Sequence, residues 1–390
     1  MAHQLTRIVA VLTLLSPFAA RPLVIEGSTG PGSVYELRVP DAGWNGDLVV
    51  YLHGITSPQS AVAIPTDVLD VAIRDGVLAR GFAWAASSFS MSGWNIRDAA
   101  QRSHQLSGLF TARVAPPHRV FLLGTSMGSL AAVELAERFP EQYAGALLAC
   151  GPLAGTREQF EYVGDVRNLF DLFYPGALPG TAAFVPEPIC DGDAVAGLVV
   201  PPILANPTSA FLLATMAQTQ LPFTRDEELV RSIALPIGWQ LCNTPYLAAA
   251  AHGTPYDNLD TKYGPMAGLP EEIRPPSAFY DWVDASIARF DADPESELWT
   301  EHGYTPTGAL QFPVVTLHTT LDPGVPAWLH EPGFAELVND AGASSRLVQR
   351  TAAHYGHCQF APSEVLGSFD ALVGWVDGGP RPAGGDVTAP

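Results

Sequence analysis

A serine stands between two glycines at residues 124–128, where the sequence reads Gly-Thr-Ser-Met-Gly. The segment follows an apolar run, 119–123, and precedes a stretch with helical spacing of apolar residues, 127–138. At such a strand-to-helix turn the serine is held in a tight, exposed conformation, and the flanking glycines leave room where larger side chains would collide. The pattern predicts Ser126 as the nucleophile of a hydrolytic reaction, with a mere tight-turn serine as the alternative.

A serine hydroxyl is a poor nucleophile until a base takes its proton, so a histidine and an acid that orients it must be present. Asp322 follows the apolar strand 312–318 and precedes Pro-Gly-Val-Pro at 323–326, a turn that would hold its carboxylate at a sheet edge. It is the candidate acid, and turn formation or helix capping is the alternative. Two histidines, His354 and His357, follow the last predicted strand and compete for the role of the base.

Strands and helices alternate along the parts of the chain that carry these residues. Continuous apolar runs are typical of inner parallel strands, and apolar residues at helical spacing separate them. The alternation predicts an α/β fold with a doubly wound, mostly parallel sheet and helices on both faces. The predicted strands are 33–39, 47–52, 82–87, 119–123, 145–149, 312–318 and 345–349. The predicted helices are 65–80, 96–113, 127–138, 333–341 and 363–376.

The alternation stops in the middle of the chain, where proline is frequent and mixed helical segments occur without a convincing inner strand. We predict a large, mainly helical inserted cap over 153–309, with helices near 207–219, 225–234 and 276–290. The catalytic domain is then expected at 21–152 and 310–378, and a chain of 390 residues is long enough for one such domain and a cap. Residues 379–390, rich in Pro and Gly, are expected to form a flexible tail.

The sequence resembles the α/β-hydrolase superfamily over residues 33–152 and 310–377. The resemblance rests on Trp-Asn-Gly-Asp-Leu-Val-Val-Tyr-Leu-His-Gly at 44–54, on the Gly-Thr-Ser-Met-Gly turn, and on the late aspartate and histidine in the family's chain order. It implies a serine hydrolase that uses neither a metal nor an organic cofactor. The resemblance does not extend to the inserted cap.

The resemblance also separates the two histidines. The family's catalytic histidine lies in a Gly-His pair followed by an aromatic residue, which matches Gly356-His357 and Phe360. We therefore expect a triad of Ser126, Asp322 and His357.

Attack on a carbonyl carbon builds negative charge on its oxygen, which two backbone N–H groups must stabilise. The resemblance implies Met127, directly after the nucleophile, as one donor, and the loop after His53-Gly54 as the source of the other, expected at Ile55. His53 is expected to fix that loop. Ser87 and Ser88, at the end of another strand, are candidates for the rim of the site, with turn formation as the alternative.

Four cysteines, Cys150, Cys190, Cys242 and Cys358, would permit two disulfides in three pairings if the protein is exported. Two of them lie in the predicted cap, and the other two follow core strands near the expected catalytic edge. These positions favour the pairs Cys190–Cys242 and Cys150–Cys358, and four buried free thiols are the alternative.

A cysteine directly after the expected catalytic histidine, Cys358 after His357, resembles the tannase and feruloyl esterase branch. In that branch a disulfide joins the histidine's neighbour to the residue before the serine. Thr125 stands at that position here, so the bond would have to run elsewhere, for example to Cys150. This departure weakens the expectation of tannase-like substrates.

Forty acidic and twenty basic residues give a formal charge of −20, which disfavours nucleic acid and anionic membrane surfaces as partners. Near the N-terminus, Arg7 precedes the apolar run 8–15, and this order is typical of a secretory signal. The run is too short to span a bilayer. We predict a signal peptide at 1–20, a secreted or periplasmic protein and no stable membrane association, with a buried N-terminal strand as the alternative.

The predicted cap is rich in aromatic residues, most of which are expected to form its own core while a few line a cleft. We therefore expect a carboxylic ester hydrolase that acts on small to medium apolar or aromatic esters, a small-molecule substrate. A peptidase or amidase is the alternative, polyester depolymerases and acyltransferases share the machinery, and a non-catalytic binding protein of this fold is disfavoured. The oligomeric state is not defined by the sequence. The aromatic residues are Phe160, Phe170, Phe173, Tyr174, Phe211, Trp239, Tyr246, Phe279, Tyr280 and Trp282.

Overall fold

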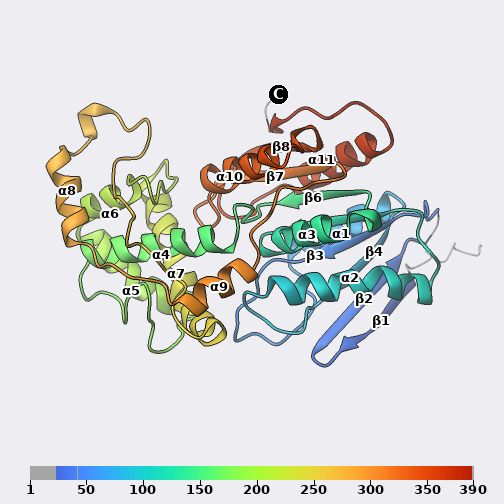
Figure 1. Cartoon of the computed structure of the whole chain (residues 1–390), viewed down its shortest axis with the longest axis horizontal. Coiled ribbons are helices and arrows are strands. Elements are labelled where there is room, and N and C mark those ends of the chain that lie inside the picture. The colour runs from blue at the N-terminus through green and yellow to red at the C-terminus, as the bar shows by residue number, and fades with distance from the viewer. Residues whose placement is uncertain (1–22, 42, 389–390) are drawn as a thin grey trace, which may run out of the picture.

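The computed structural model, which describes residues 23–41 and 43–388, is built around one nine-stranded sheet (Figure 1). Its strand order is β1-β2-β4-β3-β5-β6-β7-β8-β9. The pairs β1–β2 and β2–β4 are antiparallel, and the other pairs are parallel. The strands are β1 (Leu23–Gly30), β2 (Ser33–Val39), β3 (Leu48–Leu52), β4 (Ala83–Ser87), β5 (Val120–Thr125), β6 (Gly145–Ala149), β7 (Val314–Leu321), β8 (Leu347–Tyr355) and β9 (Gly385–Asp386).

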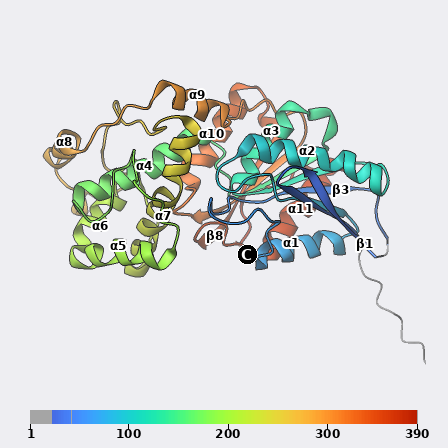
Figure 2. The same cartoon turned by 90° about the horizontal axis from the view of Figure 1, so that it is seen from below.

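Helices cover both faces of this sheet, because its inner strands are apolar on both sides and fully buried (Figure 2). On one face, α1 and α11 pack around Phe121 and Phe369. On the other face, α2, α3 and α10 enclose Leu122 and Phe334. The helices are α1 (Val68–Ala79), α2 (Ile96–Arg113), α3 (Met127–Arg138), α10 (Ala327–Asp340) and α11 (Pro362–Val376). The predicted α/β class and doubly wound, mostly parallel sheet are confirmed.

The segment between β6 and β7 is mainly helical and gathers at one end of the molecule (Figure 1). Its helices enclose a separate apolar cluster that includes Phe170 and Ile237, and the disulfide Cys190–Cys242 ties the start of α5 to α7. The predicted inserted cap is thus confirmed as part of the fold. Its helices are α4 (Thr156–Phe173), α5 (Gly192–Ala205), α6 (Pro207–Ala214), α7 (Asp226–Ala251), α8 (Ser277–Ser286) and α9 (Pro294–His302).

Short 3₁₀ turns complete the secondary structure at 140–142, 271–273 and 344–346. In the part of the chain that the structure describes, no single helix is long and apolar enough to cross a membrane. Only α5 and α6 reach that length and hydropathy together, and they meet at an angle of 105°.

Several cap helices were missed or cut short by the sequence prediction because proline interrupts their pattern. Helix α7 was expected to end near residue 234 but continues to Ala251 through Pro236 and Pro245. Helix α5 contains Pro201 and Pro202 and was not expected at all. Proline disfavours a helix interior locally, and here burial of the helix face in the cap cluster outweighs that preference.

The two ends of the chain differ in what the structure describes. The predicted signal peptide, 1–20, lies outside the described residues. The tail expected to be flexible instead lies along β8 as far as residue 388: β9 pairs with β8, and the Arg350 guanidinium donates a hydrogen bond to the carbonyl oxygen of Ala383 at 3.0 Å. The edge of β8 offers unpaired backbone groups that the tail satisfies.

The turn from β5 into α3 is tightly packed against the neighbouring strand. A methyl group added to Gly128 would meet the backbone carbonyl oxygens of Leu52 and His53 well inside van der Waals contact. Backbone atoms of two central elements cannot move aside as a flexible side chain can. Gly128 is therefore required by packing and not by its own dihedral angles.

We expect Gly128→Ala to destabilise the fold by about 1–3 kcal/mol through this overlap. Gly367→Ala is the matched control, because it lies in α11 with no atom within 4 Å of the added methyl group and should be neutral or stabilising. Thermal unfolding followed by circular dichroism compares the two variants. Equal unfolding temperatures for both would contradict the packing argument.

Candidate active site

Ser126 lies at the sharp turn between β5 and α3, with φ 51° and ψ −128°. A positive φ is rare for a side chain with a Cβ and costs on the order of 1–3 kcal/mol. The turn is held in place by the N–H of Ser126, which donates to the carbonyl oxygen of Ala149 at 2.8 Å on the neighbouring strand. The hydroxyl is thereby fixed at the carboxyl edge of the sheet.

The structure brings together the three residues that the sequence singled out as a triad. His357 Nε2 lies 2.9 Å from Ser126 Oγ, and His357 Nδ1 lies 2.7 Å from Asp322 Oδ2. Asp322 directly follows β7, and its Oδ1 accepts the N–H groups of Gly324 at 2.8 Å and Val325 at 3.0 Å. The predicted Pro-Gly-Val-Pro turn therefore aims the carboxylate at the imidazole.

His354, the competing histidine, lies away from the serine. Its Nε2 pairs with Glu364 Oε1 at 2.8 Å, at the start of α11. Of these two histidines, His357 alone is therefore placed to take a proton from Ser126.

Asp322 is fully buried, and a second histidine lies on its other side. His318 Nε2 lies 3.6 Å from Asp322 Oδ2 and donates to the carbonyl oxygen of Val325 at 2.8 Å. Its Nδ1 donates to Glu331 Oε1 on α10 at 3.0 Å. With both nitrogens directed at acceptors, His318 fits best as a charged imidazolium.

Burial alone would lower the pKa of His318, but hydrogen bonds with Asp322 and Glu331 and their charges outweigh it and raise that pKa to about 10. Burial would likewise raise the pKa of Asp322, but the neighbouring imidazoles of His357 and His318 hold it below the ordinary value. The acid of the cluster is thus kept ionised in spite of its burial.

The sequence reasoning did not find this supporting pair. His318 is the last residue of the predicted strand 312–318, which is mostly apolar. An ionisable side chain in such a strand was the available signal for a buried polar contact. Glu331 lies in a helix that Pro332 interrupts, so nothing in the local pattern pointed to it.

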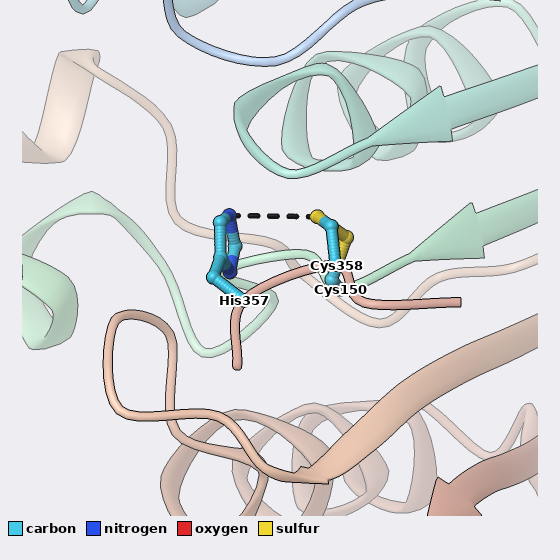
Figure 3. Close-up of side chains that lie close together, drawn as sticks. All are labelled: Cys150, His357 and Cys358. Atoms are coloured by element: carbon cyan, nitrogen blue, oxygen red, sulfur yellow. Dashed lines mark hydrogen bonds between the residues drawn. A yellow bond between two sulfur atoms is a disulfide. The ribbon is translucent and has the colours of Figure 1, made fainter. Parts of the chain in front are cut away.

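A disulfide joins Cys150, at the end of β6, to Cys358, next to the histidine (Figure 3). Cys358 Sγ lies 3.5 Å from His357 Nε2. The bond therefore ties the histidine loop to the strand beside Ser126. Both sulfurs are used in the bond, so this group of side chains offers no thiolate to a metal.

Both pairings favoured by the sequence, Cys150–Cys358 and Cys190–Cys242, are present. Two disulfides are consistent with a protein of an extracellular or periplasmic compartment.

The two expected oxyanion donors lie next to Ser126. Within the described residues, neither the N–H of Met127 nor that of Ile55 donates a hydrogen bond. Gly54 brings the second loop close, since a methyl group added there would lie 3.1 Å from Ser126 Cβ. Two unused backbone donors at this position can receive the negative charge of an oxyanion.

His53 is buried beneath that loop, as expected of a residue that fixes it. Its ring stacks on Phe89 with 3.9 Å between centroids, and its Nδ1 donates to the carbonyl oxygen of Gly54 at 2.7 Å. Burial lowers the pKa of His53 to about 4, so the ring is neutral. Ser87 and Ser88, considered for the rim, are buried and bonded to the backbone around Phe89, which makes them turn formers instead.

Above the triad, three of the cap's aromatic residues, Phe160, Trp239 and Tyr256, line a hollow that reaches Ser126. The Trp239 ring meets that of His357 edge-on, with 5.2 Å between centroids. Phe170 and Tyr174 instead belong to the cap's own apolar cluster. Most of the cap's aromatic residues therefore stabilise the cap, as expected, and few face the site.

Neither a protein-family model nor a curated protein sequence matches this chain. Feruloyl esterase B from Aspergillus oryzae has a similar solved structure, with a TM-score of 0.52 and 11% identity over 93% of this chain and 81% of that one. Acylaminoacyl peptidase from Pyrococcus horikoshii matches with a TM-score of 0.48 and 8% identity over 92% of this chain and 41% of that one. Esterase Pf2001 from Pyrococcus furiosus matches with a TM-score of 0.43 and 13% identity over 97% of this chain and 99% of that one. The likeness to the feruloyl esterase establishes the α/β-hydrolase fold, as predicted, and says nothing of the substrate.

We expect His318→Gln to lower the unfolding temperature most at and below about pH 6.5. Because the folded protein raises the pKa of His318, its stabilising contribution is complete below 6.5 and is lost as the pH rises through about 10. The difference between wild type and variant should therefore shrink over that range. Calorimetric scans at several pH values measure it.

The control for this experiment is His302→Gln, at an exposed position on α9. It should unfold close to the wild-type temperature at each pH. A His318→Gln difference that stays constant up to about pH 10 would show that the imidazolium does not stabilise the fold.

Proposed function

We propose that the protein is a serine hydrolase that cleaves carboxylic esters through an acyl-enzyme on Ser126. One observation carries the proposal: an unbroken series of contacts runs from Ser126 Oγ to His357 at 2.9 Å and from His357 to Asp322 at 2.7 Å. The series ends at a serine in a strained strand-to-helix turn beside two unused backbone donors. This combination supports nucleophilic attack on a carbonyl carbon.

In the first step, His357 Nε2 takes the proton of Ser126 as Oγ attacks the ester carbonyl. Asp322 holds the imidazole in orientation and stabilises its positive charge, while the N–H groups of Met127 and Ile55 stabilise the oxyanion. The ester C–O bond then breaks, and His357 gives the proton to the departing alcohol. Water, activated by His357 in turn, releases the acid and restores Ser126.

An ester substrate with apolar or aromatic groups is supported by the hollow that opens at Ser126, whose wall includes Val163, Leu247 and Phe160. Such a wall favours an apolar group. An amidase with the same triad is the competing activity, and the leaving group distinguishes the two.

Export to an oxidising compartment is part of the proposal. Two disulfides, one of them beside the proposed catalytic histidine, support it, because such bonds persist where thiols are not kept reduced.

We expect Ser126→Ala to fold normally and to lose ester hydrolysis by a factor on the order of 10⁴ to 10⁶, since the nucleophile is removed. Ser107→Ala, on α2, is the control and should keep wild-type activity. Purified variants are assayed on p-nitrophenyl esters and aminoacyl p-nitroanilides and labelled with a fluorophosphonate probe. Near-wild-type turnover by Ser126→Ala would refute the assignment, and anilide cleavage without ester cleavage by wild type would make the protein an amidase.

We expect His357→Ala to lose activity to a similar extent, because Ser126 then lacks its base. His354→Ala is the matched control and should stay active, since that side chain pairs with Glu364. Initial rates on one p-nitrophenyl ester suffice. An active His357→Ala with an inactive His354→Ala would reverse the choice of histidine.

A further inference from the structure

Two hollows of very different size meet at Trp239 of α7, and each reaches a different member of the triad. The first has a volume of about 60 Å³ and is lined by Ser126 and not by His357. The second has a volume of about 810 Å³ and is lined by His357 and not by Ser126. Ile55, Trp239 and Asn243 border both.

The small hollow is apolar and its wall is fixed. Its lining includes Phe160, Val163, Leu247 and Tyr256. Tyr256 is buried and donates to Asp165 Oδ1 at 2.8 Å, and its ring packs on Gly164, where no larger side chain would fit.

Gln159, on the same wall, is held from both ends of its amide. Its Nε2 donates to the carbonyl oxygen of Gly324 at 2.9 Å, and its Oε1 accepts from His330 Nε2 at 2.8 Å. Because these polar groups are already paired inside the protein, the wall is rigid and sets the size of the group that enters.

A volume of 60 Å³ is small compared with known ligand cavities. An apolar cavity of about 150 Å³ in another protein binds benzene. At about 60 Å³ the small hollow has less than half of that volume, so it has room for a short acyl chain and not for a phenyl ring.

The large hollow is open and mixed in character. Its wall includes apolar side chains such as Val195 and Leu235 and polar ones such as Arg231, Tyr355 and Gln359. A third hollow of about 360 Å³ continues it past His357 and Cys358 to Ser126. A bulky group can lie here without being enclosed.

The chemistry of the proposed reaction assigns one hollow to each half of an ester. The bond that forms joins Ser126 Oγ to the acyl carbon, and the bond that breaks joins that carbon to the alcohol oxygen. The proton taken from Oγ passes through His357 Nε2 to that oxygen, so the alcohol must lie on the His357 side. The acyl chain then points to the hollow that touches Ser126 alone.

We propose that the preferred substrates are esters of a short acyl group, about two to four carbons long, with a bulky alcohol that lies in the open groove beside His357. The inference rests on the proposed function and adds to it which half of the ester is size-limited. Trp239 separates the two halves.

The test uses p-nitrophenyl esters with acyl chains from acetyl to decanoyl and with benzoyl. We expect kcat/KM to be highest from acetyl to butyryl and at least tenfold lower for octanoyl and benzoyl. A preference for octanoyl or benzoyl in wild type would overturn the inference and leave the proposed function intact. Absence of any ester cleavage by folded wild type would instead overturn the proposed function and the inference with it.

Two variants enlarge the small hollow, so that the inference can still be tested if one of them fails to fold. Leu247→Ala removes a buried wall residue and Phe160→Ala a partly exposed one. Each should raise kcat/KM for octanoyl relative to acetyl esters by tenfold or more. Leu235→Ala, in the wall of the open groove, is the matched control and should leave the acyl preference unchanged. An unchanged preference in both enlarged variants would overturn the assignment of the acyl chain to this hollow.

The alcohol side is tested with the acyl group held constant, by comparing 1-naphthyl acetate with phenyl acetate. Because the groove is open, kcat/KM for the larger alcohol should equal or exceed that for the smaller one. A kcat/KM tenfold lower for 1-naphthyl acetate than for phenyl acetate would place the size limit on the alcohol and overturn the inference.

Discussion

The positive φ of Ser126 is the constraint on which the site depends. A serine is forced into this conformation because the chain must reverse from β5 into α3 within one residue while two glycines pack against neighbouring backbone. The strain is offset by the buried sheet on one side and the helix on the other, both rich in apolar contacts. As a result the hydroxyl stands at the sheet edge where the loops after β7 and β8 can reach it.

Charge in the site is arranged around a buried carboxylate. Asp322 lies between two imidazoles, one toward the serine and one, His318, that is itself paired with Glu331. A lone buried carboxylate would be protonated at neutral pH, whereas this one lies beside the charged His318, is hydrogen-bonded to His357 and accepts two backbone N–H groups. The strongly acidic surface of the protein therefore has little influence on the state of the acid, which its immediate neighbours determine.

The sequence predicted well those features that residues close together in the chain determine. The strand-to-helix turn of Ser126 and the turn after Asp322 are local patterns, and the alternation of apolar runs with helical spacing predicted a mostly parallel sheet. What the prediction missed depends on contacts between distant segments. Helix α7 runs through two prolines because the cap buries it, and Glu331 meets His318 only once α10 packs on β7. Ser87 and Ser88 sit at a strand end, as polar rim residues would, but β2 and the loop around them cover both.

The disulfide between Cys150 and Cys358 links residues 208 positions apart, with the whole cap between them. Synthesis on the ribosome runs from the N-terminus, and domains fold as they emerge. In a nascent chain, the Ser126 turn and the cap can therefore form before Cys358 is synthesised, while Cys150 is still a free thiol. His357 and Cys358 are synthesised after the cap, so this disulfide can form only once nearly the whole chain has been made, and a reducing host would accumulate a chain that lacks it.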